Sequence, residues 1–218
     1  MYQTQKKLGR PVDETLPGRR REEILDAAAR LFAERGFSDT DTQALVDSLG
    51  VGKGTLYRYF ASKEDLFLAT VDRAMCRLRE TVDAATSNIA DPLALMQSAI
   101  SAYLRFFEEN PGYVELLIQE RAQFKDRKKP TYFEHREKNI GRWHDLFTRL
   151  IAEGRVREVS VERLTGVISN LVYGTMFTTY FAGRTVPIDE QVRDILDLVF
   201  NGILTDEERG QRAEGRGQ

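Results

Sequence analysis

The 218-residue sequence has one cysteine, Cys76, and two histidines, His135 and His144. A single thiol excludes a disulfide framework within the chain, and the sequence shows no signal peptide, so a reducing cytoplasm is the expected location. The histidines stand nine positions apart on one expected helix, hence on opposite faces, and neither has a histidine, cysteine or carboxylate three or four positions away. We therefore expect no metal site and no cofactor.

The local motifs of common enzymes are also missing. The sequence contains no Gly-x-Ser-x-Gly, no His-Glu-x-x-His and no glycine-rich dinucleotide loop. Gly52 and Lys53 resemble the end of a P-loop, but that loop needs a glycine where Asp47 stands and Ser or Thr where Gly54 stands. The preceding segment, 42–49, has helical spacing instead of a strand pattern. We do not expect an enzyme, although catalysis by residues that meet only in the folded chain stays open.

A strong excess of positive charge is absent from the chain as a whole, whose formal net charge is −2. The first 21 residues nevertheless hold six cations, against only Asp13 and Glu14; the cations are Lys6, Lys7, Arg10, Arg19, Arg20 and Arg21. A basic arm over 1–19 can neutralise DNA phosphates, and it can equally be a solvated tail.

Hydrophobic periodicity is helical along the chain, and no strand pattern competes with it. It predicts an all-α fold of about nine helices, with an N-terminal three-helix domain over 20–67, a C-terminal helical domain over 68–204, and a disordered tail over 205–218. The expected helices are 20–35 ending at Gly36, 42–49 capped by Thr40 or Asp41, 52–60, a long one after the Ser62 and Asp65 capping box, 92–107 capped by Asp91, 113–124, 130–154, 160–182 and 188–204.

The segment from Gly50 to Phe60 predicts a tight turn followed by a short helix. Glycine at position 50 suits the left-handed end of the preceding helix. In the second helix Leu56 and Phe60 share one face, while Lys53 and Arg58 point elsewhere, so one face is buried and the other carries donors. Two short helices joined in this way are typical of a helix-turn-helix whose second helix enters the major groove.

Residues 20–67 resemble the DNA-binding domain of the tetracycline-repressor (TetR) family of bacterial transcriptional regulators. The resemblance includes the pairs Ile24-Leu25, Ala27-Ala28 and Leu31-Phe32, then Gly36-Phe37, Leu45, Gly50-Val51, Lys53 to Tyr57, Tyr59-Phe60 and Ser62-Lys63-Glu64. The chain departs from the family pattern at Asp41, Val46 and Gly52, and the last of these supplies no hydroxyl as a cap or a phosphate ligand.

The resemblance implies a homodimer whose two recognition helices lie about one DNA turn apart over a palindromic operator. It also implies a ligand cavity in each C-terminal domain, and an inducer that shifts the fourth helix and separates the two DNA-reading heads. Matching positions imply phosphate contacts from Thr42, Tyr57, Tyr59 and Lys63, an approach to bases by Lys53, Thr55 and Arg58, and a place for Gly54 in the same DNA-binding set. The alternatives are a helical protein that binds other proteins, or a small molecule, without DNA.

Residues 164–183 carry no charge over twenty positions, a length that could span a bilayer. Nine of the twenty are Gly, Ser, Asn or Thr, so we expect no membrane span. An uncharged helix is instead expected to be covered on both sides, once by its own domain and once by a second chain. The expected dimer interface, from this helix and the last one, comprises Gly166, Gly174, Thr178, Phe181, Val192, Ile195 and Val199.

The C-terminal half is rich in aromatic residues, some of which are expected to line an apolar pocket for a small-molecule inducer. Similarity to multidrug-efflux regulators of the family implies a hydrophobic ligand. The expected aromatic lining is Tyr103, Phe107, Trp143, Phe147, Tyr173 and Phe177, and the expected polar groups are Arg121, His144 and Asn170.

Overall fold

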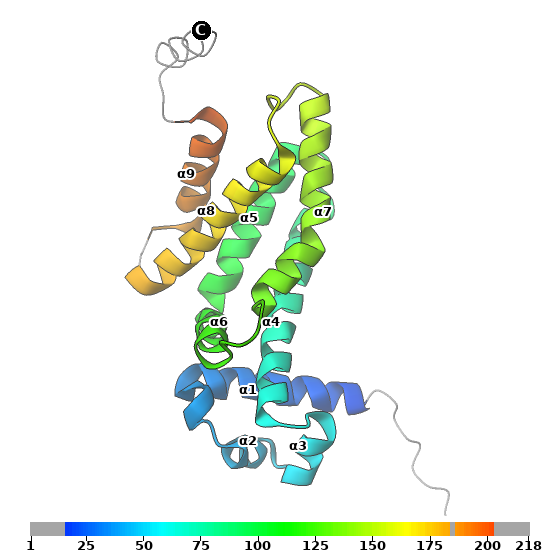
Figure 1. Ribbon diagram of the computed structural model, residues 1–218, viewed down its shortest axis with the longest axis vertical. Helices are drawn as coiled ribbons and strands as arrows, with labels where there is room; N and C mark the ends of the chain where they lie inside the picture. Colours follow the sequence, from blue (N-terminus) through cyan, green and yellow to red (C-terminus); the bar gives the residue numbers. More distant parts are fainter. Residues whose placement is uncertain (1–15, 184–185, 203–218) are drawn as a thin grey trace, which may run out of the picture. The chain divides into compact units, whose positions relative to one another are not determined.

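The computed structural model describes residues 16–183 and 186–202, and every regular element in these ranges is an α-helix (Figure 1). The chain divides into two compact units, residues 1–73 and 74–218. The helix α4 (Lys63–Thr86) contributes to both units, and the predicted domain boundary after residue 67 falls inside it. The all-helical class expected from the sequence is confirmed.

The N-terminal unit contains α1 (Leu16–Asp39), α2 (Thr42–Leu49), α3 (Lys53–Tyr59) and the start of α4. Its core includes the fully buried Phe32 and Phe67, which pack edge to face with ring centroids 5.1 Å apart. Gly36 interrupts α1 with φ 81° and ψ 161°, a backbone conformation essentially confined to glycine. The helix break predicted at this position is therefore real, although helical turns resume briefly beyond it.

Local chemistry sets the limits of α2 as the sequence predicts. The Asp41 carboxylate accepts a hydrogen bond from the Gln43 backbone N–H at 2.8 Å, so Asp41 is the cap of α2. Thr40 has a different role, because its hydroxyl donates to the Gly36 carbonyl at 2.7 Å. At the other end Gly50 is left-handed, with φ 61° and ψ 34°.

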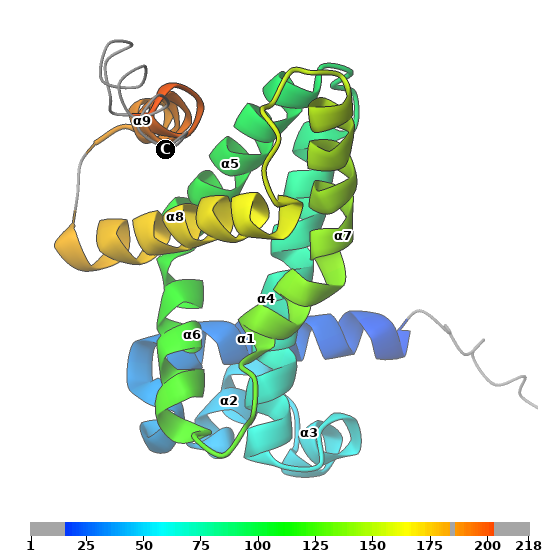
Figure 2. The ribbon, with the colours of Figure 1, turned by 45° about the horizontal axis from the view of Figure 1, so that its top comes forward.

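The C-terminal unit contains the rest of α4 and five further helices: α5 (Pro92–Glu109), α6 (Pro111–Gln123), α7 (Thr131–Ala152), α8 (Val161–Ala182) and α9 (Ile188–Asn201). The helix α5 packs against α6, α8 and α9, and α8 also packs against α7 (Figures 1 and 2). The predicted cap of α5 is present, since Asp91 accepts from the Ala94 N–H at 2.9 Å; Ser160 caps α8 in the same way, accepting from the Arg163 N–H at 3.2 Å.

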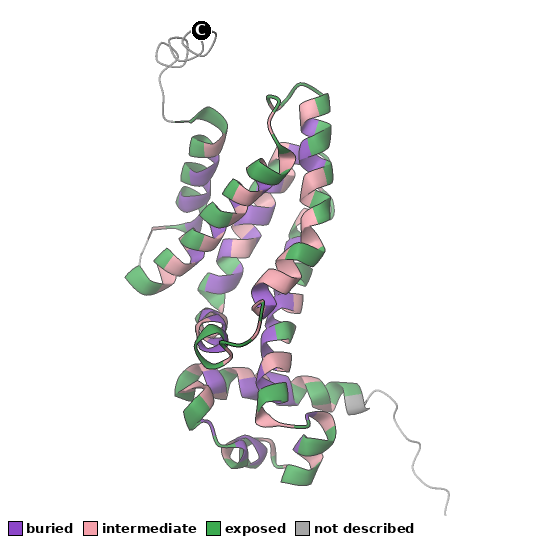
Figure 3. Ribbon diagram, in the orientation of Figure 1, coloured by how far each residue is buried: buried purple, intermediate pink, exposed green. Residues whose placement is uncertain are grey.

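The apolar face of the last helix, α9, was expected to be covered by a second chain, but much of it is buried within the single chain. Val192 and Ile195 were expected at a dimer interface, but they are only 2% and 8% exposed within the single chain. The reason is that α9 packs this face against α5 of its own unit, so the two residues belong to the subunit core. Figure 3 shows the buried faces of the helices within each unit. Among the described helices, none is long and apolar enough to cross a membrane.

Candidate DNA-binding surface and ligand cavity

The turn between α2 and α3 is fixed by backbone hydrogen bonds. The Gly50 N–H donates to the Asp47 carbonyl at 3.2 Å, and the Val51 N–H donates to the Val46 carbonyl at 3.0 Å. These bonds satisfy carbonyls at the end of α2 and turn the chain sharply. The next helix begins three residues after Gly50, at Lys53, and its N-cap Gly52 makes no side-chain hydrogen bond.

The short helix α3 has one buried and one exposed side. Leu56 is 1% exposed and is held in the core of the N-terminal unit. The exposed residues are Lys53, Gly54, Tyr57 and Arg58, and the half-buried ones are Thr55 and Tyr59. The outward side therefore presents two cations and a phenol hydroxyl, groups that bind phosphate oxygens and base edges.

Side chains around α3 are positioned by aromatic and hydroxyl contacts. The Arg58 guanidinium lies over the Tyr59 ring, 5.3 Å from its centroid. The Tyr57 hydroxyl is 3.4 Å from that of Thr42, so this pair joins α3 to the start of α2. Thr42, expected as a phosphate contact, is only 8% exposed, and its hydroxyl is engaged with Tyr57.

Lys63, another expected phosphate contact, is oriented toward α1. Its Nζ donates to the Ser38 carbonyl at 3.1 Å and lies 4.8 Å from the centroid of the Phe37 ring. Within the described part of the chain, Lys53, Arg58 and Lys63 form no ion pair with a carboxylate. No carboxylate of residues 16–183 or 186–202 therefore neutralises their charges.

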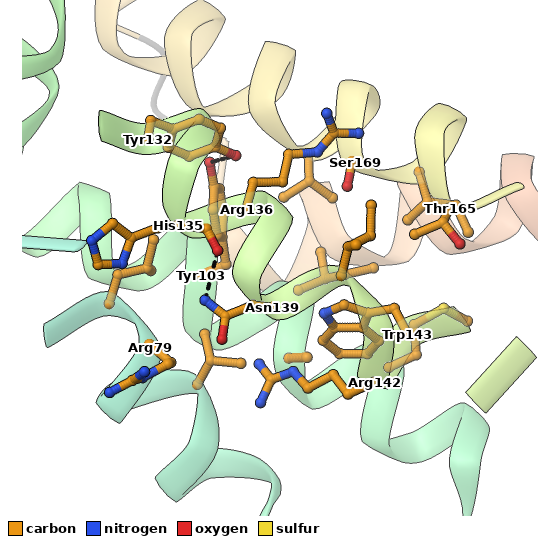
Figure 4. Close-up of a pocket in the computed structure, with 18 of the residues that line it drawn as sticks. Arg79, Tyr103, Tyr132, His135, Arg136, Asn139, Arg142, Trp143, Thr165 and Ser169 are labelled. Carbon is orange, nitrogen blue, oxygen red and sulfur yellow. Dashed lines mark hydrogen bonds between the residues drawn. The ribbon is translucent and has the colours of Figure 1, made fainter. Parts of the chain in front are cut away.

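The C-terminal unit contains a partly open cavity of about 170 Å³ lined by α4, α5, α7 and α8 (Figure 4). Its apolar lining consists of Met75, Leu78, Val82, Met96, Ala99, Ile100, Ile140, Trp143, Phe147, Ile168 and Val172. Its polar lining consists of Arg79, Tyr103, Tyr132, His135, Arg136, Asn139, Arg142, Thr165 and Ser169. An apolar chamber with a few polar groups is the usual composition of a small-molecule site.

Two tyrosines form a hydrogen-bonded pair at the cavity. The hydroxyl oxygens of Tyr103 and Tyr132 are 3.0 Å apart, and the Tyr103 hydroxyl also faces the Met176 sulfur at 3.6 Å. Burial raises the pKa of Tyr132 to about 12 and raises the pKa of Tyr103 well above its ordinary value. Desolvation disfavours the phenolate, so both hydroxyls stay protonated at neutral pH and keep their donors.

The arginines of the cavity differ in their surroundings. Arg142 is ion-paired with Asp83, and its guanidinium lies 5.1 Å from the centre of the Trp143 ring. The Nε of Arg136 is buried and has no hydrogen-bond partner among the described residues. Arg136 lines the cavity, is half-buried and forms no ion pair with a carboxylate of the described residues.

Three of the nine residues expected at a ligand pocket line this cavity, namely Tyr103, Trp143 and Phe147. His144 does not, because it follows Trp143 by one residue, which turns its side chain about 100° around α7. Asn170 follows the lining residue Ser169 in the same way and is exposed. Which residue of each neighbouring pair faces the cavity depends on the packing of the helices.

The other expected pocket residues lie elsewhere in the C-terminal unit. Phe107 is 3% exposed and packs against Tyr103, with ring centroids 5.1 Å apart. Phe177 is half-buried beside Tyr173, at 4.9 Å. Arg121 and Tyr173 line a second cavity, of about 400 Å³, together with Leu117, Glu120, Arg127, Lys128, Pro130, Tyr132 and Phe133.

Sequence reasoning missed the cavity residues Tyr132, Arg136 and Asn139, although the helical period contains a signal for Arg136. Arg136 precedes Trp143 by seven positions and Phe147 by eleven, so all three fall on one face of α7. Starting from the two aromatic residues, the helical period would have selected Arg136 instead of His144.

The outer face of α8 is exposed along most of its length. Val167, Leu171 and Phe181 are exposed by 51%, 42% and 68%, large values for apolar side chains. Gly174 and Thr178, expected at a dimer interface, are also exposed, and Gly166 and Val199 are half-buried. Residues 167, 171, 174, 178 and 181 follow the helical period, so they form one continuous apolar and small-residue surface, which we call the α8 face.

The helix-turn-helix with an exposed cationic second helix, joined to a helical unit with an internal cavity, defines a DNA-binding regulator of the helix-turn-helix class. Residues 24–70 match the family described as bacterial regulatory proteins, tetR family. The chain is 32% identical over 190 residues to the HTH-type transcriptional repressor KstR2 of Mycobacterium tuberculosis, covering 84% of this chain and 92% of that protein. The chain belongs to the TetR family, as its N-terminal motif indicated.

Solved structures share the fold. The TetR family transcriptional regulator PfmR from Thermus thermophilus aligns with a TM-score of 0.66 at 25% identity, over 84% of this chain and 99% of that one. The transcriptional regulator FadR from Bacillus subtilis, solved in complex with stearoyl-CoA, aligns with a TM-score of 0.69 at 20% identity, over 84% and 99% of the two chains. This second likeness concerns the fold alone.

Proposed function

We propose that this regulator is a homodimeric repressor that binds a palindromic operator through α3 and releases it when a small molecule occupies the C-terminal cavity. The observation that carries the proposal is the outward side of α3, where Lys53 and Arg58 lie exposed with no ion pair among the described residues. Repression is supported by the related KstR2, which is named a transcriptional repressor. An operator-binding protein acts where the DNA is, so we also place it in the cytoplasm.

The α8 face supports the dimer. Exposed apolar patches on a protein surface mark interaction sites, and small residues such as Gly174 and Thr178 let two helices approach closely. A two-fold axis would bring the face of one subunit against the same face of the other. Two copies of α3 would then read two half-sites related by the same axis, which is why the operator is expected to be palindromic.

The helix α4 offers a physical route from ligand to DNA. Met75, Leu78 and Val82 on α4 line the cavity, while residues 63–73 of the same helix belong to the unit that contains α3. A ligand that binds one position of α4 better than another shifts the equilibrium between those positions. We propose that, when α4 takes the position favoured by the ligand, the distance between the two copies of α3 no longer matches the distance between the operator half-sites.

The DNA-binding proposal is tested by gel shift against promoter-proximal palindromes, beginning upstream of the protein's own gene, with a salt titration. We expect Arg58→Ala to weaken specific binding by about 1–3 kcal/mol, the value of a base-reading arginine. Lys53→Ala should reduce the salt dependence by about one counterion, if Lys53 meets a phosphate. Arg149→Ala, which removes an exposed charge from the C-terminal unit, is the control and should bind like the wild type.

Two results would contradict the proposal. One is the absence of salt-dependent, sequence-specific binding at any promoter-proximal palindrome. The other is unchanged affinity in both the Arg58→Ala and Lys53→Ala variants, the behaviour expected of a helical protein that does not bind DNA through α3.

A further inference from the structure

The cavity in the C-terminal unit has an imbalance of charge. Three arginines and a histidine line it, and none of its described lining residues is Asp or Glu. A chamber whose polar groups are neutral or cationic disfavours a cationic ligand and favours an anionic one. The remaining walls are mostly apolar, so the anion must also carry an apolar body.

Only one of the arginines is available as an inward anchor. Arg142 already pairs with Asp83 and lies on the Trp143 ring. Arg79 is exposed, so water can solvate its charge. Arg136 is half-buried, its Nε is enclosed without a hydrogen-bond partner, and it makes no ion pair with any described carboxylate. A buried donor without an acceptor is costly, and a ligand that supplies the acceptor removes that cost.

The groups around Arg136 are suited to the same ligand oxygen atoms. In Figure 4 the Arg136 guanidinium points toward Ser169 of α8, and the hydroxyls of Tyr103 and Tyr132 lie beside its side chain. Burial raises the pKa of each phenol, so both stay protonated at neutral pH; each has a single O–H, and because one of the two is donated within the Tyr103–Tyr132 pair, the pair can donate at most one hydrogen bond to a ligand. Hydrogen bonds to an ionised acceptor are about twice as strong as those between neutral groups.

We propose that the cavity binds an amphipathic organic anion, such as a carboxylate with an apolar body, whose charged group sits on Arg136. The apolar body lies against the apolar side chains Met75, Ile100, Trp143 and Phe147. This inference rests on the proposed function in one respect, because it names the chemistry of the inducer. The expected order of affinity is anion, then neutral analogue, then cation.

The test uses the only tryptophan of the chain, Trp143, which lines the cavity and reports its occupancy by fluorescence. The full-length protein is titrated with decanoate, decan-1-ol and decylamine, which share an alkyl chain and differ in head-group charge. We expect saturable binding of decanoate, at least about tenfold tighter than that of decan-1-ol, because a charge-assisted bond is added. Decylamine should bind more weakly than either.

Variants at position 136 test whether Arg136 causes the preference for decanoate over decan-1-ol. Arg136→Met keeps an apolar stem, and it should reduce the preference of decanoate over decan-1-ol to within about twofold while decan-1-ol still binds. Arg136→Lys keeps the charge and should retain part of the preference. Arg149→Met makes the same charge change on α7 outside the cavity lining, and should match the wild type. Thermal melts establish that each variant is folded.

The inference is overturned if decanoate produces no saturable change, if decan-1-ol binds as tightly as decanoate, or if folded Arg136→Met keeps the full preference. Operator binding is measured separately by gel shift on protein without ligand. Loss of operator binding together with an Arg136-dependent preference would refute the proposed function and leave the anion site standing. Normal operator binding without a preference for decanoate would refute the anion site and leave the proposed function standing.

Discussion

Glu120 is a carboxylate buried in the C-terminal unit, and its removal should destabilise the protein strongly. It lies near the end of α6, is 1% exposed, and its Oε1 accepts from both the N–H and the hydroxyl of Thr131, at 2.9 and 2.8 Å. Thr131 is the first residue of α7, and the preceding Pro130 provides no side-chain cap. Glu120 therefore caps α7, the helix that carries Arg136 and Trp143, from another helix.

The expected cost of Glu120→Ala follows from these contacts. The substitution leaves the buried Thr131 N–H without an acceptor, which costs about 1–3 kcal/mol. It also leaves space where the Cγ methylene and the carboxylate lay, and the lost methylene costs about 1 kcal/mol more. Arg127, whose Nε is 3.6 Å from Oε1, keeps its partner Glu134 at 3.0 Å, so its loss is small. The free energy of unfolding should fall by about 2–4 kcal/mol.

The assay is urea unfolding of the wild type, Glu120→Ala, Glu120→Gln and Thr131→Val. Glu120→Gln keeps an acceptor oxygen, so it should lose about half as much as Glu120→Ala or less. The double variant Glu120→Ala with Thr131→Val should cost less than the sum of the single variants, with a coupling of about 0.5–3 kcal/mol. An unfolding free energy for Glu120→Ala within about 0.5 kcal/mol of the wild type would refute the reasoning.

Two further changes test other parts of the chain. The pKa of Asp91 is lowered by the hydrogen bond from the Ala94 N–H and by Arg155. The ionised carboxylate therefore stabilises the fold fully at a pH above its ordinary pKa of 3.8. This stabilisation is lost as the pH falls through the lower pKa of Asp91 in the folded protein. Asp91→Asn should consequently melt below the wild type at neutral pH, with the gap closing in acid, and a gap that does not depend on pH would contradict this. Leu171→Glu places a charge on the α8 face, and sedimentation should show a folded monomer for this variant and the proposed dimer for the wild type; a variant that remains a dimer would exclude that face.

The DNA-reading part of the chain could be predicted closely, because its structure depends on local chemistry. A carboxylate at 41 and a glycine at 50 are enough to begin and end α2, and the structure uses both. Leu56 was expected on the buried side of α3 and Arg58 on the exposed side, as observed. Periodicity within a few helical turns contains this information.

The cavity could be predicted only in part, because its lining depends on how four helices turn toward one another. Apolar periodicity shows that a face is buried but not what covers it. Val192 and Ile195 illustrate this, since their burial was expected and the covering helix proved to be α5 of the same chain. The contact between Glu120 and Thr131, eleven residues apart across a loop, leaves no pattern in the sequence at all.

Two of the cations around α3 contact aromatic rings, and these contacts determine what each cation loses when it moves to a DNA phosphate. Arg58 lies on the ring of Tyr59 and Lys63 on the ring of Phe37, so the partner of each cation is an aromatic ring and not a carboxylate. When such a side chain turns to a phosphate, it also leaves no carboxylate behind without a partner. In the DNA complex that we propose, the attraction between these two cations and the phosphates is therefore not offset by the loss of an ion pair among the described residues.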